Sequence, residues 1–236
     1  MKYLGLLIVV LFQGCSVEER IVERYNNGNP KVLEKWAKEK VVFRREYHSN
    51  NIRKREGPVL NGQFHGPIKE WNSNGVLWAE GDYNFGLPDG DWVYWYKKNT
   101  MRQKGAFLNG QKHGLWLAYY KTGVLKQKQN FKIGKLKGEA ETFFPSGSLQ
   151  YSNSCHQQDG WKQEFSSKSQ LLVKESCSYN RSNGLYQRWD VLGNLLESGN
   201  FILGHKTGAW KYYFAAGNLR KVESWDKGLR HGVWWA

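Results

Sequence analysis

The sequence lacks a long apolar run and a recognisable cluster of catalytic side chains. Its most apolar run, Tyr3 to Phe12, has ten residues, too few to span a bilayer, which needs roughly 20. No cysteine, serine or histidine has the spacing of a nucleophile arrangement, and Asp89 and Asp91 flank a glycine as turn-forming residues do. The sequence therefore predicts a protein that is not an enzyme and needs no cofactor.

Acidic residues and proline are also scarce. The 21 Asp and Glu residues stand against 35 Lys and Arg, which gives a formal charge of +14. A surplus of this size favours anionic partners or surfaces and says nothing about the fold. There are 5 prolines but 26 glycines and many aromatic residues, a mixture typical of short strands joined by tight turns.

The N-terminal segment has the features of an export signal. Lys2 precedes the apolar run, and Gly14 and Cys15 follow it. The end of the run resembles the lipobox of bacterial lipoproteins, in which the cysteine is lipidated and becomes the first residue. Phe12 and Gln13 depart from the usual lipobox residues. An ordinary cleaved signal and a hydrophobic first strand are the alternatives.

The lipobox resemblance implies a location. Residues 1–14 would be the signal peptide, Cys15 would carry the lipid, and residues 15–19 would form a short linker. The protein would then be exported and anchored to the bacterial cell envelope, on the outer membrane if the cell has one. Basic residues interleaved with aromatic ones also occur in proteins that bind single-stranded nucleic acid, but export would remove that partner.

One pattern of glycine and aromatic residues recurs along most of the chain. With Gly90 as position 0, equivalent glycines follow at intervals of 24 residues, except for an interval of 22 between Gly138 and Gly160. An aromatic residue stands at +5, as Trp95 does, and a leucine or methionine stands at +11, as Met101 does. A fixed period of this length indicates a repeat array. The other equivalent glycines are Gly66, Gly114, Gly184, Gly208 and Gly232.

The array is predicted to cover residues 20–236 in about nine units and to be irregular near 150–182. Each unit is predicted to be a β-hairpin, and successive hairpins are predicted to continue one elongated antiparallel meander sheet, so the fold class is all-β. No hairpin can bury its aromatic residues alone. Neighbouring units are therefore expected to stack their side chains at +5, +11 and +17.

The turn glycines set an expected register. The dipeptide at +8/+9, such as Asn74-Gly75, is predicted to form a two-residue turn of the primed type, which needs positive φ. Counting outward from this turn places +2 opposite +15 on the partner strand. A large side chain at +2 is then expected to cover the glycine opposite it, which stabilises a strand that glycine weakens. The expected pairs are Trp92 with Gly105, Tyr186 with Gly199, and Ile68 with Gly81.

The repeat resembles the MORN repeat, and more closely its bacterial variant. The segments YWYKKNTMRQKGAFLNGQKHGLW and YYFAAGNLRKVESWDKGLRHGVWW carry this resemblance. It implies an elongated sheet of hairpins that acts by binding, as a scaffold, membrane-apposition or protein-interaction module. Some bacterial variant-MORN proteins are labelled antitoxins, so a toxin-neutralising or immunity protein is the alternative to an envelope scaffold.

Basic residues concentrate in the second loop of the units. Alternate turns of a meander emerge on one long edge, so these charges are expected to form a line. A solvated edge that keeps the protein soluble is one interpretation. The other is contact with a protein partner, an anionic envelope polymer or anionic lipid. The residues of this candidate basic edge are Lys112, His113, Lys132, Lys135, Lys137, His205, Lys206, Lys227, Arg230 and His231.

The histidines do not suggest a metal site. His65, His113 and His231 all stand at −1, but His65 and His113 are two units apart. Two units are four strands, or roughly 19 Å, whereas zinc ligands lie about 2 Å from the metal. These histidines are interpreted as turn residues, and no metal is expected.

The two remaining cysteines leave a disulfide open. Cys155 and Cys177 occupy the same +17 position in adjacent units, and export favours disulfides. Equivalent positions lie two strands apart, however, roughly 9.6 Å, whereas bridged Cα atoms lie within about 7 Å. The alternatives are a disulfide, allowed by the shortened 22-residue interval, and two buried small apolar side chains.

The last segment, GVWWA, ends after the first strand of a new unit. Trp234 and Trp235 are therefore expected on an open sheet edge, and open edges pair readily with another strand. This pattern predicts edge-to-edge self-association or a partner that covers the edge.

Overall fold

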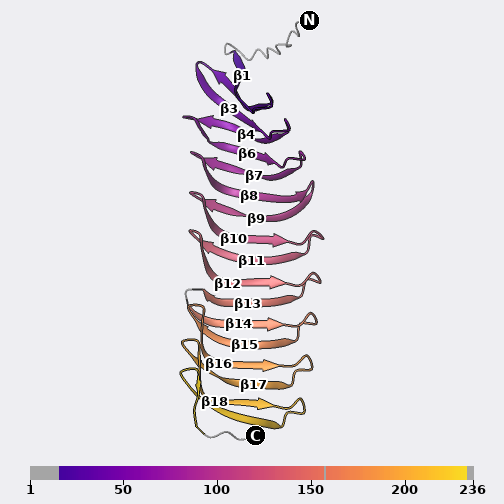
Figure 1. The fold of residues 1–236 in the computed structure, drawn as a ribbon, viewed down its shortest axis with the longest axis vertical. Helices are drawn as coiled ribbons and strands as arrows, with labels where there is room; N and C mark the ends of the chain where they lie inside the picture. The colour runs from indigo at the N-terminus through magenta and orange to yellow at the C-terminus, as the bar shows by residue number, and fades with distance from the viewer. Residues whose placement is uncertain (1–15, 157, 233–236) are drawn as a thin grey trace. The chain divides into compact units, whose positions relative to one another are not determined.

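The computed structural model describes residues 16–156 and 158–232, and within these ranges the regular elements are all β-strands (Figure 1). The chain divides into two compact units, Met1–Gln111 and Lys112–Ala236. In each unit, strands pair antiparallel with their neighbours in the sequence. The predicted all-β class and the antiparallel meander of hairpins are thereby confirmed. The described residues contain no helix that could cross a membrane.

Unit 1 contains the first nine strands. They are β1 Val17–Arg24, β2 Pro30–Ala37, β3 Lys40–Tyr47, β4 Arg53–Leu60, β5 Gln63–Phe64, β6 Gly66–Trp71, β7 Leu77–Asn84, β8 Leu87–Lys97 and β9 Thr100–Leu108.

Unit 2 contains the other strands, of which β10 begins one residue before the unit boundary. They are β10 Gln111–Tyr119, β11 Leu125–Lys132, β12 Lys135–Phe143, β13 Leu149–His156, β14 Asp159–Phe165, β15 Leu171–Ser178, β16 Arg181–Trp189, β17 Leu195–Ile202, β18 His205–Tyr213, β19 Leu219–Asp226 and β20 Leu229–Arg230.

The register within hairpins follows the prediction. Trp92 of β8 pairs with Gly105 of β9, Tyr186 pairs with Gly199, and Ile68 pairs with Gly81. Counting outward from the repeated glycines therefore located the correct partner on the opposite strand.

For Gly81 and Gly199 the predicted covering is wrong, because the covering ring comes from the next hairpin. A Cβ added to Gly81 would lie 2.6 Å from Cγ of Trp92, and one added to Gly199 would lie 2.7 Å from Cγ of Trp210. Each indole Nε1 donates a hydrogen bond to the carbonyl that follows the covered glycine, Asp82 O at 3.0 Å and Asn200 O at 3.2 Å. This hydrogen bond holds the ring over the preceding hairpin.

The sheet buries its +2 residues most completely. Ile68, Trp92, Trp116 and Trp210 are almost fully buried. The +5 and +11 residues, predicted to stack, are half-buried except for the exposed Leu219, and alternation along the strand places +5 on the face opposite +2. The +17 residues lie on the +2 face, where their rings contact the +2 rings, as Phe201 and Trp210 do with centroids 5.1 Å apart.

The first turn of each unit is not the predicted two-residue primed turn. In the turn after β6, Asn72 N donates to Val76 O at 3.0 Å and Gly75 N donates to Asn72 O at 2.9 Å. Gly75 has a φ of 79°, whereas Asn74 before it has no positive φ. This pattern is a type I turn followed by a glycine in the left-handed region, a three-residue loop. The glycine was correctly assigned to the turn, but only one positive φ is needed there.

The second turn is the primed one. Between β4 and β5, Asn61 and Gly62 have φ values of 51° and 79°, and Leu60 pairs with Gln63 across them. Two consecutive positive φ values in a two-residue loop define a type I′ turn, for which Asn-Gly is the preferred sequence.

Four units place a bulky residue at the first position of the type I′ turn. These residues are Phe85 (φ 45°), Ile133 (φ 49°), Tyr179 (φ 47°) and Leu203 (φ 49°). The left-handed region is unfavourable for such side chains, and most unfavourable for β-branched ones such as isoleucine. All four side chains are exposed, so core packing does not compensate for the strain.

Replacing Ile133 with asparagine is expected to stabilise the protein by about 1 kcal/mol, because asparagine tolerates the left-handed region. Urea unfolding followed by circular dichroism measures the change. The matched control is the reverse substitution Asn109→Ile at the equivalent position (φ 49°), which should destabilise by a similar amount. A lower stability for Ile133→Asn would contradict the assignment of strain to this turn.

The two predicted functional ends of the chain fall outside the described residues. Cys15 precedes the first described residue, and Trp234 and Trp235 follow the last one. Lipidation and C-terminal self-association therefore stay predictions.

Candidate binding surface on the second-turn edge

The type I′ turns of unit 2 come out on one side of that unit, the left side in Figure 1. We call them the second-turn edge; they comprise residues 132–135, 178–181, 202–205 and 226–229. Backbone hydrogen bonds fasten neighbouring turns to one another's flanking strands, from Gly204 N to Ser182 O at 2.8 Å and from Gly228 N to Lys206 O at 3.0 Å. The turn backbones are thus fixed while their side chains point outward.

Large apolar side chains project from this edge. Tyr179 is 69% exposed, Leu203 is 65% exposed and Leu229 is 74% exposed, and Ile133 and Ile202 are exposed as well. An exposed apolar residue is ordinary when it stands alone, but a row of them marks a contact surface. Sequence reasoning missed this row because it considered only the charges in the second loop.

Cations flank the apolar side chains. Lys132, Lys135, Arg181 and Lys227 are exposed in three of the four turns, and the turn 202–205 contains no Lys or Arg. Asp226 is the acidic residue within the four turns. Three of these four cations belong to the predicted basic edge, and Arg181 is added by the structure. The second-turn edge therefore combines apolar tips with positive charge.

Two residues predicted on the basic edge lie on the aromatic +2 face instead. Lys112 Nζ is 4.2 Å from the ring centroid of Trp116, and burial lowers the pKa of this ammonium. Lys206 Nζ is 3.7 Å from the ring centroid of Trp210 and donates to Glu197 Oε1 at 3.3 Å. The −2 position pairs with +17, as Lys206 does with Phe201, so its side chain belongs to the ring-lined face.

The other predicted edge residues have mixed environments. His113 is half-buried, and Lys137, His205 and His231 are exposed. Arg230 is held by Glu223, with Nη2 3.3 Å from Oε1. Burial would raise the pKa of Glu223, but hydrogen bonds from Lys221 and Tyr212 lower it overall, so this carboxylate stays charged beside Arg230.

The aromatic +2 face is a packed surface. Tyr186, Phe201 and Trp210 contact each other with ring centroids 5.1 to 5.7 Å apart. In unit 1, Glu34 is 6% exposed and is bound by Arg44, whose Nη2 lies 2.6 Å from its Oε1. Rings and carboxylates on this face are therefore engaged with their neighbours.

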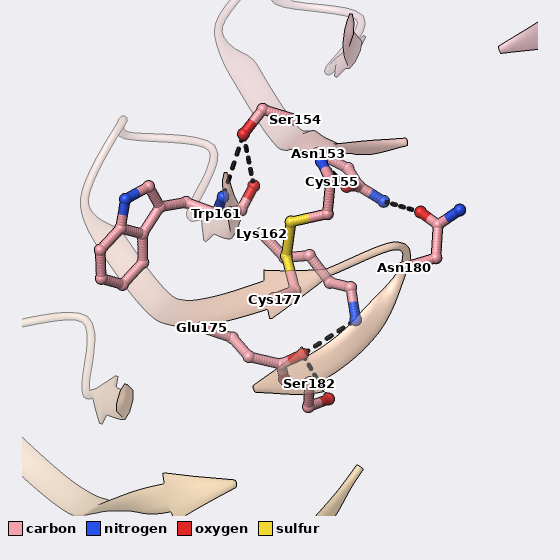
Figure 2. The surroundings of a disulfide bond; sticks show 9 residues. All are labelled: Asn153, Ser154, Cys155, Trp161, Lys162, Glu175, Cys177, Asn180 and Ser182. Atoms are coloured by element: carbon pink, nitrogen blue, oxygen red, sulfur yellow. Dashed lines mark hydrogen bonds and ion pairs between the residues drawn. A yellow bond between two sulfur atoms is a disulfide. The ribbon is translucent and has the colours of Figure 1, made fainter. Parts of the chain in front are cut away.

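Cys155 and Cys177 form a disulfide, with their Cα atoms 5.8 Å apart (Figure 2). The spacing of a regular array, roughly 9.6 Å, does not apply here. Pairing between β13 and β14 ends at Asn153 and Lys162, so β13 leaves the ladder before Cys155. The carbonyl of Cys155 then accepts a hydrogen bond from Asn180 N, in the turn after β15, at 3.0 Å.

Ser154 and Gly160 make this departure possible. Trp161 N donates to Ser154 Oγ at 3.0 Å, and Ser154 Oγ lies 3.3 Å from Trp161 O, which replaces lost ladder hydrogen bonds (Figure 2). A Cβ on Gly160 would overlap Ser154 Oγ and lie 3.1 Å from the Ser154 carbonyl oxygen, so glycine is needed for this approach.

The described residues contain no group of three or more side chains suited to a metal ion. In unit 1, a shallow depression of about 460 Å³ is lined by Glu23, Glu34, Arg44 and Glu46 together with two valines. Each carboxylate in it is paired: Glu23 with Lys31, Glu34 with Arg44 and Glu46 with Arg55. This arrangement supplies no nucleophile with a neighbouring base.

The fold and the repeated turns define a protein built from β-hairpin repeats. A family model described as the MORN repeat variant matches residues 64–84 and 112–132, so these two segments are MORN repeats of the variant type. Both matched segments run from position −2 to position +18 of their unit, and the two units are 48 residues apart. The repeat between them, which forms β8 and β9, has the same hairpin geometry. A search of curated proteins finds no match to the chain.

Proposed function

We propose that this protein is an exported, lipid-anchored scaffold of the cell envelope that binds its partner through the second-turn edge of unit 2. MORN-repeat proteins are generally non-catalytic binding scaffolds. One observation carries the proposal: Ile133 and Leu203 occupy left-handed turn positions where asparagine would be more stable, both are exposed, and Ile133 shares its turn with Lys132 and Lys135. Strained residues retained without a packing reward are characteristic of functional contacts.

Two features support export. The N-terminal apolar run ends at Gly14-Cys15, as a lipoprotein signal does. The buried Cys155–Cys177 disulfide is typical of proteins that fold outside the reducing cytosol. A toxin-neutralising protein of the cytosol, the alternative, would have to fold without this disulfide.

Replacing Cys15 with alanine is expected to abolish lipid attachment and to change both the size and the location of the protein. Cell fractionation, combined with metabolic labelling by a fatty acid, measures the two effects. Wild-type protein should be labelled and found in the membrane fraction, whereas the variant should be unlabelled and keep its signal segment. Cytosolic location and unchanged size for both proteins would overturn the envelope assignment and favour the toxin-neutralising alternative.

A further inference from the structure

β1 lies at the N-terminal end of unit 1 (Figure 1). Within residues 16–156 and 158–232, β2 is the strand that pairs with it, so the other side of β1 is open. All eight residues of β1 are exposed, including the apolar Val17 (52%) and Ile21 (42%). A strand of this length with an open side offers unpaired backbone N–H and C=O groups to a further strand.

Charged side chains often protect an edge from pairing, so the charge pattern of β1 decides what can add to it. Its regular part is residues 17–21, which precede a register shift against β2. Glu18 and Arg20 lie on one face of the sheet, where Arg20 Nη2 is 2.5 Å from Glu18 Oε2. Glu19 lies on the other face, with its Oε1 2.7 Å from Lys35 Nζ.

One antiparallel register between two β1 strands matches all of these side chains. It places Glu19 opposite Glu19 of a second copy. Each Glu18 then faces an Arg20 of the other copy, which gives two ion pairs on one face. On the opposite face each Val17 meets an Ile21 of the other copy, and each central glutamate keeps the lysine that already binds it.

The neighbouring registers are unfavourable. Moving the centre by one residue places Glu18 opposite Glu18, or Arg20 opposite Arg20, and brings apolar side chains opposite charged ones. Of these registers, the one centred on Glu19 alone matches opposite charges. We infer that the open side of β1 binds β1 of a second copy of this chain in that register, so that the two sheets continue as one across a two-fold axis.

This surface belongs to unit 1, so the inference goes beyond the proposed function, which concerns the second-turn edge of unit 2. A single strand pair buries little surface and is expected to be weak in solution. Lipid attachment at Cys15, two residues before β1, would strengthen it, because two copies on one membrane have a high effective concentration. The pairing itself needs no anchor and is tested without one.

Disulfide crosslinking measures the register directly. Glu18→Cys, Glu19→Cys and Arg20→Cys variants of the full chain also carry Cys15→Ala and are oxidised in a mild detergent, which shields the N-terminal apolar run. The substituted position of Glu19→Cys lies opposite itself, with Cα atoms about 5 Å apart, so this variant should form a covalent dimer. The other two should react about tenfold more slowly alone, because their Cα atoms lie more than about 7 Å apart, but should crosslink when mixed.

Charge reversal tests the ion pairs, with Glu19→Cys in every chain as the reporter. Glu18→Arg or Arg20→Glu alone should slow crosslinking about tenfold, because both ion pairs become repulsive. Mixing the two variants should restore it, since one chain is then basic at both positions and the other acidic. Arg20→Gln is the matched control; it loses the same contact with Trp36, whose ring centroid is 5.1 Å from the guanidinium, adds no repulsion, and should slow crosslinking only about threefold.

Equal crosslinking of the three single-cysteine variants, or no loss on charge reversal, would overturn the pairing of β1. A chain that sediments as a monomer at its highest soluble concentration would overturn it as well. Deleting residues 233–236 should leave the crosslink unchanged, and its disappearance would assign self-association to the C-terminal edge instead. The fractionation of Cys15→Ala tests envelope anchoring separately, so either idea can fail without the other.

Discussion

Replacing Trp210 with alanine is expected to lower the free energy of unfolding by about 4 kcal/mol, the usual cost of removing a buried tryptophan. Trp210 is 0% exposed, and its ring lies over Gly199 and contacts Phe201 with centroids 5.1 Å apart. Its removal also leaves the Asn200 carbonyl without the indole donor and uncovers Lys206, whose Nζ is 3.7 Å from the ring centroid. The loss should therefore exceed the value for an exposed tryptophan several-fold.

Urea unfolding followed by circular dichroism measures this loss, with Trp161→Ala as the matched control. Trp161 is 37% exposed, and Lys174 Nζ lies 4.3 Å from its ring centroid. Its replacement should cost about 1 kcal/mol, mainly through the lost cation–π contact. Equal losses for the two tryptophans would contradict the claim that the +2 face carries most of the packing.

A double-mutant cycle tests the ring-over-glycine contact itself. Gly199→Ala should cost about 2 kcal/mol in the wild-type background, because the new methyl would overlap the Trp210 ring. In the Trp210→Ala background the same change should cost much less, since the space above residue 199 is then open. The two effects are thus expected to be strongly non-additive, and simple additivity would show that the ring does not constrain this glycine.

Most of the fold could be predicted because each unit repeats the same local signals. The +9 glycine, the glycine at −4 and the glycine at 0 are all at positive φ in the regular units, as Gly75, Gly86 and Gly90 are. Such positions favour glycine on backbone sterics alone, so they are visible in a single sequence. Strand pairing then follows from counting, which is why Trp92 was correctly placed opposite Gly105.

What counting could not predict was direction across strands. A residue at +15 has a +2 residue on each side, and the +2 side chain of the next hairpin is the one that covers it: Trp92 lies over Gly81, and Ile68 lies over Gly57 without any hydrogen bond to hold it. The assignment of the primed turn failed for a related reason. Both loops contain glycine, and the residue that distinguishes them, the first residue of the type I′ turn, is often bulky, as in Ile133 and Leu203.

The candidate site was predicted only in part. The concentration of basic residues correctly identified the second loop. Lys112 and Lys206, at position −2, were wrongly placed on the edge because −2 was treated as a loop position. The strand register pairs −2 with +17, so both side chains lie on the aromatic face. The apolar tips had a usable signal. A large residue where Asn-Gly is expected, as at Ile133-Gly134 and Leu203-Gly204, sacrifices turn stability and so indicates a role outside folding.

Removing the Cys155–Cys177 disulfide is expected to destabilise unit 2 by about 3 kcal/mol, because the bond closes a loop with a sequence separation of 22. The shortened interval between Gly138 and Gly160 predicted an irregular unit but not the disulfide. The bond forms because Ser154 and Gly160 let β13 approach β15, and the sequence alone did not show this contact. Urea unfolding of the Cys155→Ser/Cys177→Ser variant, with and without reductant, measures the change. Reductant should lower the wild-type midpoint to that of the variant and leave the variant unaffected.

The positions that lose protection from hydrogen exchange show whether the disulfide acts locally or stabilises the whole protein. β13 pairs with β14 at only three positions, from Tyr151 to Asn153. After Asn153 the disulfide does the work that main-chain pairing between β13 and β14 does elsewhere in the sheet. Hydrogen exchange in the double serine variant should therefore accelerate most at Asn180 N and Trp161 N, which bond to Cys155 O and Ser154 Oγ. Strands β7 and β8 of unit 1 should keep their protection, since stability in a repeat array depends mainly on adjacent units. Equal acceleration in both units, or a wild-type midpoint that does not respond to reductant, would show that the disulfide does not fasten the irregular repeat.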